Sequence, residues 1–186
     1  MMYRTPGTSR IKLRQKTKEF REQTQVKDLR CIPIVRILET LPHVFNGWNY
    51  EVVDDWKLPK CHAKTIIDEK TVLLRQSVYD GACLKSGRDR MTIAHEIAHV
   101  AIHGQNPLAL NRDFDQDRPI RAFEDPEWQA KCWSGELMMP KEYVEGWDVL
   151  DIVEICGVSR EAAEYQKKKW KEERGKRKGT KSRSTI

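Results

Sequence analysis

The sequence lacks three features, each of which would point to a different class of protein. No apolar run approaches the roughly 18 residues of a transmembrane helix, so we expect no membrane span. The basic start, residues 1–18, has no apolar stretch behind it and is not expected to be a secretory signal. No internal repeat occurs, which excludes a solenoid. With 186 residues, 39% of them hydrophobic, the chain can build one core.

The cysteines show no framework of disulfides. There are five of them, widely scattered and without a C-x-x-C pair. An odd, dispersed set argues for reduced thiols. We therefore expect a cytoplasmic protein.

The net charge of +6 is unevenly distributed along the chain. Residues 1–36 hold ten Lys/Arg and three Asp/Glu, and residues 167–186 hold ten and two. Residues 37–166 hold 14 Lys/Arg against 23 Asp/Glu. An acidic body between two basic ends is not typical of a uniformly basic nucleic-acid-binding domain, so we do not expect direct binding to nucleic acid.

The hydrophobic pattern predicts an α+β fold, a mostly helical single domain with a small twisted three-stranded sheet. We expect strands at 50–53, 65–67 and 72–74, and helices at 31–40, 90–103, 126–139, 149–155 and 159–170. The charged segment 11–29 is expected to form a surface helix, because its apolar residues are sparse. Residues 1–10 are expected to be frayed, and Gly104 is expected to end its helix in a left-handed conformation.

The segment His95-Glu96-Ile97-Ala98-His99 carries the clearest functional signal. Histidines four residues apart lie on one side of a helix and can bind one Zn²⁺. The glutamate beside the first histidine can accept a proton from a zinc-bound water. The segment therefore predicts His95 and His99 as metal ligands, Glu96 as the catalytic base, and hydrolysis of an amide bond.

A catalytic zinc needs a third protein ligand. We favour Glu127, in the first turn of the next helix, because the small side chains of Ala130 and Ser134 on the same face would let that helix approach closely. Glu124, just before this helix, is an alternative. His103 is another, since it continues the row of histidines, although three such residues drift around a helix.

Two segments resemble signatures of the ImmA/IrrE-type metallopeptidases. Residues 92–99, TIAHEIAH, are similar to the zinc helix of that family. Residues 127–140, EWQAKCWSGELMMP, resemble its second signature, E-x-x-A-N-x-F-A-x-x-L-L-x-P, with Lys131 in place of asparagine, Trp133 in place of phenylalanine and Ser134 in place of alanine. Residues 157–163 resemble its C-terminal segment, so the likeness runs from about residue 65 to residue 166.

The resemblance implies a gluzincin-like fold, with the motif glutamate as base and the downstream glutamate as third ligand. It also implies cleavage of Xre-like helix-turn-helix repressors that silence mobile elements or stress genes. We expect a zinc metallopeptidase domain over 31–170, between a basic N-terminal extension (1–30) and a basic disordered tail (171–186). The repressor is expected to be a separate chain. Candidate donors to the oxyanion are Tyr79, Tyr143, His103 and Arg90.

Three other hypotheses stay open. A peptide-deformylase-like enzyme would use Cys83 as ligand, although this residue lies only 12 positions before His95. A zinc-stabilised regulator could bind DNA through a helix-turn-helix over 148–170, or bind a repressor without cleaving it.

If the chain is a peptidase, we expect the acidic loop 105–126, with Asp113, Asp115 and Asp117, to recruit a basic surface of the substrate.

Overall fold

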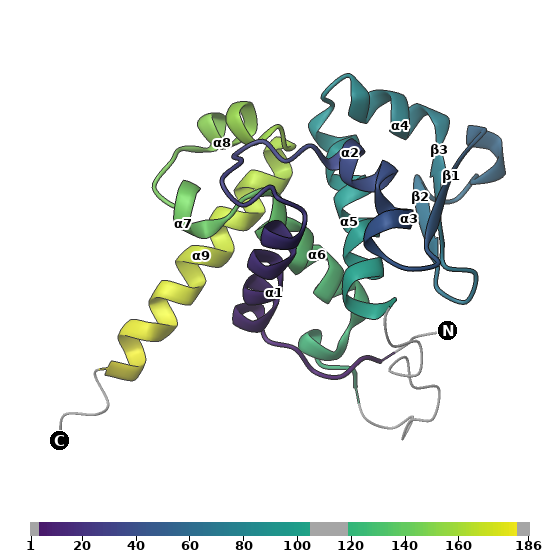
Figure 1. Cartoon of the computed structure of the whole chain (residues 1–186). Helices are drawn as coiled ribbons and strands as arrows, with labels where there is room; N and C mark the ends of the chain where they lie inside the picture. Colours follow the sequence, from purple (N-terminus) through teal and green to yellow (C-terminus); the bar gives the residue numbers. More distant parts are fainter. Residues whose placement is uncertain (1–3, 105–118, 182–186) are drawn as a thin grey trace.

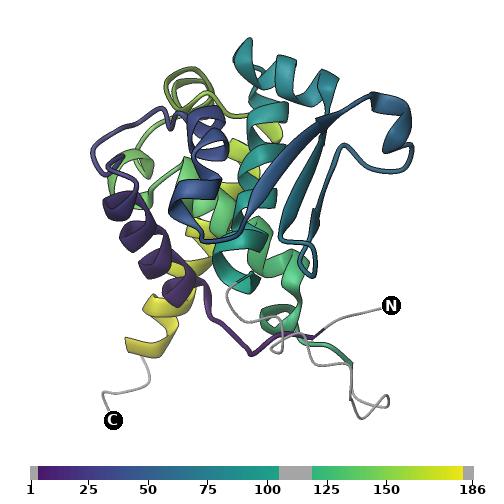
Figure 2. The same ribbon diagram turned by 45° about the vertical axis from the view of Figure 1, so that its right-hand side comes forward.

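A small sheet and a group of helices meet along the helix α5 (Gly87–His103), as Figure 1 shows. The sheet lies on one side of α5, and α1 (Arg10–Gln23), α6 (Pro126–Met138) and α9 (Arg160–Lys181) lie on the other, an arrangement also visible in Figure 2. The computed structural model describes residues 4–104 and 119–181, with side chains up to residue 175. The α+β fold predicted from the sequence is confirmed.

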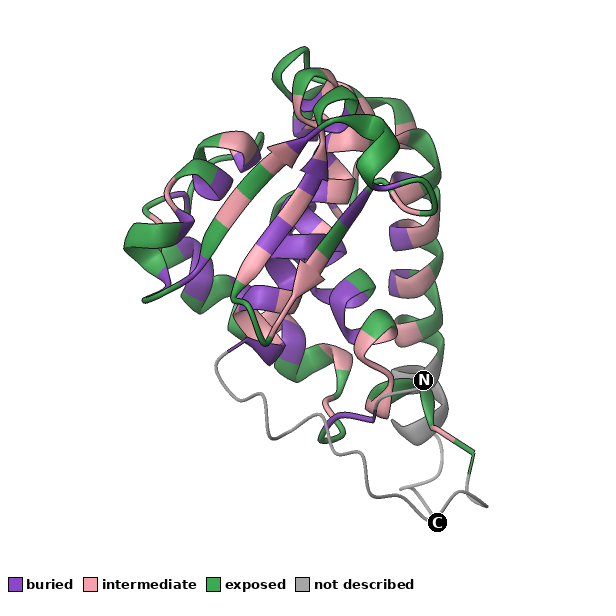
Figure 3. Cartoon of the chain, turned by 90° about the vertical axis from the view of Figure 1, so that its right-hand side faces the viewer, coloured by how far each residue is buried: buried purple, intermediate pink, exposed green. Residues whose placement is uncertain are grey.

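The sheet has the strand order β1-β3-β2, with β3 (Thr71–Arg75) in the centre. Strand β1 (Asn49–Val53) pairs with β3 in parallel, and β2 (Ala63–Ile66) pairs with it antiparallel, in the registers Asn49↔Thr71 and Ala63↔Leu74. Burial alternates along β3, where Val72 and Leu74 are fully buried, as expected for a strand with one face on the core (Figure 3). Edge strand β2 contacts α5.

The remaining elements are α2 (Ile34–Glu39), α3 (Leu41–Val44), the short 3-10 helix η1 (Asp55–Lys57), α4 (Gln76–Cys83), α7 (Lys141–Val144) and α8 (Val149–Cys156). Among them, α2 and α8 match helices expected from the sequence, whereas α3, η1, α4 and α7 were not expected. The side chains of Asp148 and Ser159 accept backbone N–H groups at the starts of α8 and α9. Gly157, with φ of 62°, supplies the left-handed residue between these two helices. No helix in the described residues is long and apolar enough to cross a membrane.

Helix α1 is not a surface helix, contrary to the expectation from its sequence. Leu13 is fully buried and Phe20 is 5% exposed, and the Phe20 ring meets the ring of Trp133 on α6 edge-on at 4.9 Å between centroids. The helix therefore belongs to the main core. Its apolar residues are few because charged residues also face inward.

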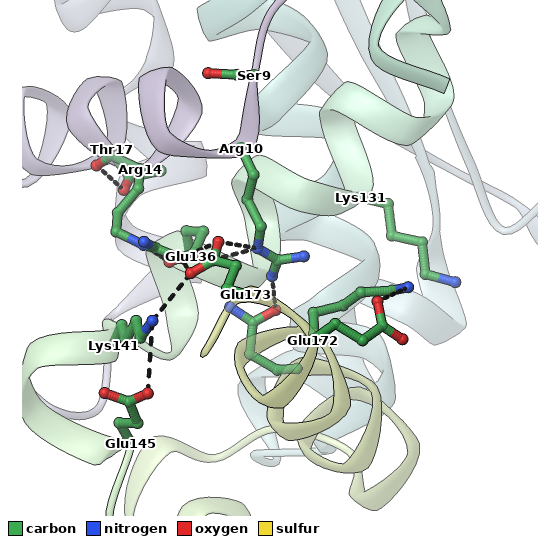
Figure 4. Close-up of polar contacts among 12 residues, drawn as sticks. Ser9, Arg10, Arg14, Thr17, Lys131, Glu136, Lys141, Glu145, Glu172 and Glu173 are labelled. Carbon is green, nitrogen blue, oxygen red and sulfur yellow. Dashed lines mark hydrogen bonds and ion pairs between the residues drawn. The ribbon is translucent and has the colours of Figure 1, made fainter. Parts of the chain in front are cut away.

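A buried ion cluster joins α1 to α6 and α9 (Figure 4). The side chain of Glu136, 0% exposed, accepts hydrogen bonds from Arg10 Nε at 2.8 Å and Arg14 Nε at 2.7 Å. Arg14 Nη2 also donates to Glu173 Oε1 at 3.0 Å, and Lys141 Nζ donates to Glu173 Oε2 at 2.9 Å. Burial alone would lower the pKa of Arg14, but the hydrogen bonds and charges of Glu136 and Glu173 raise it overall.

Residues 4–8 and 171–181 are more ordered than the sequence suggested. Thr5 N donates to Glu124 O at 2.8 Å and Thr8 N to Phe123 O at 2.9 Å, so residues 4–8 pair with the 3-10 helix η3 (Ala122–Glu124) instead of fraying. At the other end, α9 continues to Lys181, although disorder was expected from residue 171. The ion pairs of Glu173 explain the difference, because they attach this part of α9 to α1 and α7.

Gly104 ends α5 with φ of −69° and ψ of −21°, so the expected left-handed conformation is wrong. A Cβ atom at this position would lie 2.4 Å from Cζ2 of Trp48. The residue is thus small because the Trp48 side chain packs against the helix end. The acidic residues Asp113, Asp115 and Asp117 of the expected recruiting loop lie outside the described residues.

Candidate metal centre

Helix α5 carries both histidines of the motif toward α6. Ser86 accepts a hydrogen bond from Asp89 N at the start of α5, and Ile93 and Ile97 bury its opposite face in the core. His95 and His99 are left half-buried, as the 3.6-residue period requires.

Helix α6 brings Glu127 to the histidines. Asp125 caps this helix by accepting a hydrogen bond from Glu127 N at 2.9 Å, and Pro126 follows as its first residue. Ala130 and Ser134 are buried, at 0% and 2% exposure, on the helix that contacts α5. Small side chains thus accompany the close approach of the two helices, as the sequence argument required.

The three predicted ligands lie together in the structure. His95 Nε2 is 3.2 Å from His99 Nε2 and 3.1 Å from Glu127 Oε2, and His99 Nε2 is 3.4 Å from Glu127 Oε1. One ligand atom from each side chain lies within 4.8 Å of the others, so the group could hold a metal ion. The imidazoles of His95 and His99, which lie against the Glu127 carboxyl, hold its pKa well below its ordinary value, which keeps it ionised.

Glu96 follows His95 on α5 but is not one of the three candidate metal ligands. Glu96 is 8% exposed, and Thr65 Oγ1 of strand β2 donates a hydrogen bond to Glu96 Oε2 at 2.6 Å. Both Glu96 and His95 line a cleft of about 720 Å³. Its other walls come from the start of β2 and from α6 and α9, and they include Ala63, Ser134 and Tyr165. The carboxylate is therefore held at the wall of a space large enough for a peptide segment.

A family comparison agrees with this arrangement. Residues 62–167, more than half of the chain, match the model of the peptidase family described as the IrrE N-terminal-like domain. The chain belongs to this family. The matched segment of this IrrE-like chain contains β2, the motif on α5, Glu127 on α6 and the start of α9.

One solved structure shows the same fold at low sequence identity. It is described as a Mycobacterium tuberculosis transcriptional regulator and is similar to this chain with a TM-score of 0.56 and 17% identity. The alignment covers 82% of this chain and 45% of that one, so the IrrE-like chain spans less than half of that protein. Among proteins of curated function, no match is found.

The two alternative third ligands of the IrrE-like chain do not join the group of candidate ligands. Glu124 belongs to η3, where its Oε2 accepts a hydrogen bond from Arg121 N at 3.2 Å and lies 3.9 Å from Arg4 Nε. His103 is buried, at 4% exposure, and touches His99 through a contact of 3.2 Å between their Nδ1 atoms. Burial lowers the pKa of His103 to about 4. Neither residue belongs to the His95, His99 and Glu127 group.

The other candidate donors are engaged at a distance from the site. Tyr79 donates to Glu39 Oε1 at 2.6 Å, and this hydrogen bond raises its pKa. Arg90 is buried and donates to the carbonyl oxygens of Ile32 and Gly157. Tyr143 faces Arg21 at 5.9 Å. Cys83, the ligand of the deformylase hypothesis, is an exposed residue at the end of α4 and is absent from the group of candidate ligands.

Sequence reasoning missed two side chains of this region, Thr65 and Gln129. Gln129 is 1% exposed and its Oε1 lies 3.1 Å from His103 Nε2. Thr65 lies 31 residues before Glu96 along the chain, and Gln129 lies 26 residues after His103. No short-range pattern connects residues at such separations, so nothing in the sequence indicated that Thr65 and Gln129 contact the site.

Proposed function

We propose that this chain is a zinc-dependent metallopeptidase in which His95, His99 and Glu127 hold the ion and Glu96 is the catalytic base. The observation that carries the proposal is the convergence of the three ligand atoms beside a carboxylate at the wall of a cleft. Membership of a peptidase family supports a protein substrate.

The donor set fits zinc. Two neutral imidazoles and one carboxylate are ligands that catalytic zinc sites use. With zinc–nitrogen distances of about 2.0–2.1 Å, tetrahedral coordination places two ligand nitrogens about 3.3 Å apart. Here the two Nε2 atoms are 3.2 Å apart, Glu127 Oε2 lies 3.1 Å from His95 Nε2, and Glu127 Oε1 lies 3.4 Å from His99 Nε2. Once both Nε2 atoms are unprotonated, as metal binding requires, a shared cation relieves the repulsion between the nitrogens and the carboxylate.

The chain's own residues then supply the acid–base chemistry. A bound zinc ion supplies Lewis acidity to water and to the scissile carbonyl. Glu96 orients the attacking water, accepts its proton at a carboxylate oxygen and passes that proton to the nitrogen of the leaving amine. Thr65 holds Glu96 Oε2 by a hydrogen bond, so the Glu96 side chain is oriented before substrate arrives. The cleft beside both residues would hold the peptide segment to be cut.

For the substrate we propose a helix-turn-helix repressor of Xre type, cleaved in the cytoplasm to release mobile-element or stress genes. This step rests on the family resemblance. The structural neighbour is described as a transcriptional regulator, which is compatible with such a role. It also keeps open a zinc-stabilised regulator that binds a repressor without cleaving it.

Direct DNA binding through α8 and α9 is less well supported. The start of α9 exposes Glu161 and Glu164, and the exposed face of α8 carries Asp151 and Glu154. Carboxylates at these positions would repel the phosphate backbone. A mobility-shift measurement at physiological salt separates this hypothesis from proteolysis.

The test is Glu96→Gln with zinc analysis and a cleavage assay on a purified repressor of Xre type. The amide has the same shape and cannot accept a proton, so zinc content stays unchanged while cleavage falls by about 10²–10⁴-fold. For the ligands, Glu127→Ala loses zinc, and Glu124→Ala is the matched control that keeps it. Cleavage by Glu96→Gln at the wild-type rate would overturn the mechanism, and full zinc occupancy in Glu127→Ala would overturn the ligand set.

A further inference from the structure

A row of hydrogen-bonding groups runs from the proposed ligand His99 to the main chain. His99 Nδ1 lies 3.2 Å from His103 Nδ1, and His103 Nε2 lies 3.1 Å from Gln129 Oε1. The amide nitrogen of Gln129 donates to the carbonyl oxygens of Pro6 at 3.0 Å and Phe123 at 2.8 Å. His103 and Gln129 are 4% and 1% exposed, so water does not compete for these groups.

The direction of every hydrogen bond in this row follows from its far end. Carbonyl oxygens accept and never donate, so the Gln129 nitrogen must face Pro6 and Phe123, and its Oε1 must face His103. An amide oxygen also accepts only, so His103 Nε2 carries a hydrogen. In the neutral ring, His103 Nδ1 is then bare and accepts a hydrogen bond from Nδ1 of His99.

The consequence for His99 is a fixed tautomer. With its hydrogen on Nδ1, His99 presents a bare Nε2 to His95 Nε2 and Glu127 Oε1. A metal ion needs this lone pair. In the opposite tautomer, the hydrogen on Nε2 would occupy the position of the ion and would have to move before binding.

We propose that His103 and Gln129 are positioning residues that hold His99 as the Nδ1–H tautomer before a metal binds. The proposal rests on the metal site proposed above. It also gives the N-terminal segment a role, because Pro6 supplies one of the two carbonyls that orient Gln129 and is held in place by the pairing of Thr5 and Thr8 with η3.

The first measurement uses the metal-free protein with ¹⁵N-labelled histidine. Long-range ¹H–¹⁵N correlation spectra distinguish a protonated from a bare ring nitrogen. We expect His99 with its hydrogen on Nδ1 and His103 with its hydrogen on Nε2. In Gln129→Leu, His99 becomes a mixture of tautomers. A wild-type His99 with its hydrogen on Nε2 would overturn the proposal, whatever the protein's catalytic activity.

The second measurement is zinc affinity by competition with a chromophoric chelator. His103→Leu and Gln129→Leu are expected to bind zinc about 10–100-fold more weakly, the usual effect of losing a partner of a ligating histidine. His103→Gln, which keeps an acceptor oxygen for His99 Nδ1, is expected to retain most of the affinity. Gln166→Leu is the matched control with unchanged affinity, since Gln166 is equally buried and accepts a hydrogen bond from Arg10.

The pair of His103 variants separates positioning from packing. Leucine fills a buried site better than glutamine, so a merely structural role predicts that His103→Leu has the higher melting temperature and the higher zinc affinity. The positioning role predicts that the order of affinities is the reverse of the order of stabilities. Equal zinc affinity in His103→Leu and the wild type would overturn the proposal. If the two His103 variants bind zinc in the order expected for positioning but the wild type cleaves no substrate, the proposed function alone is overturned.

Discussion

Replacement of Glu136 by glutamine measures how much the buried ion cluster contributes to stability. The variant keeps the size of the side chain and removes a charge that is 0% exposed and accepts three hydrogen bonds from Arg10 and Arg14. The side chains of Arg10 and Arg14 are only 11% and 13% exposed, so solvent compensates little for the lost counterion. Removal of one partner of a buried pair typically costs about 3–5 kcal/mol.

The lower end of that range applies here. Glu173 stays 3.0 Å from Arg14 Nη2 and 3.8 Å from Arg10 Nε and still compensates part of their charge. We therefore expect Glu136→Gln to lower the free energy of unfolding by about 3 kcal/mol. For a chain of this size, the melting temperature would fall by roughly 6–12 °C.

An exposed ion pair of equal length provides the control. Arg160 Nε and Glu164 Oε1 are also 2.8 Å apart, but their side chains are 72% and 53% exposed. Exposed pairs contribute about 0.2–1 kcal/mol, so Glu164→Gln should change little. Urea unfolding of the metal-free proteins compares the two variants. If Glu136→Gln loses no more stability than Glu164→Gln, burial does not determine the strength of these pairs and the reasoning fails.

Two further predictions concern Glu173 and the end of α9. A chain that ends after Arg174 should melt like the full-length protein, whereas one that ends after Lys171 loses the pairs of Glu173 with Arg14 and Lys141 and should melt at a lower temperature; equal melting temperatures would contradict this. Burial raises the pKa of Glu173, but hydrogen bonds from Lys141 and Arg14 lower it more, to below its ordinary 4.5. A carboxyl with a depressed pKa in the folded state stabilises the fold above the unfolded pKa, and this contribution is lost as pH falls through the lower folded value. The difference in unfolding free energy between the wild type and Glu173→Gln should thus be constant above about pH 5 and shrink below it; a difference unchanged down to about pH 3 would refute the assignment.

Local signals in the sequence predicted much of the fold. The period of α5, the cap at Asp125 and the β-branched runs of the strands depend on neighbouring residues, and the structure has these elements within a few positions. Strand order could not be predicted in this way, because β1 and β3 pair at a sequence separation of 22 residues. The role of α1 was misjudged for a physical reason: inward-facing arginines look like solvent-exposed ones until the buried Glu136 is placed opposite them.

The candidate site likewise contains residues that the sequence predicted and residues that only the structure reveals. Spacing along one helix gave His95, Glu96 and His99, and a capped first turn gave Glu127; the structure brings these residues together, and their roles stay predictions. The partners Thr65 and Gln129 came only from three-dimensional packing. A threonine on a strand and a glutamine inside a helix are ordinary at those positions, so nothing in the sequence distinguishes them.

The ion cluster has a consequence for how this domain can be transferred between proteins. The segment that matches the family model, residues 62–167, contains Glu136 but not Arg10, Arg14 or Glu173. Excised at those limits, the segment would lose the arginines that pair with Glu136 and would expose the face of α6 that α1 covers, including Trp133. The smallest transferable unit must therefore begin before Arg10 and continue past Glu173, so that α1 and its ion pairs travel with the family segment.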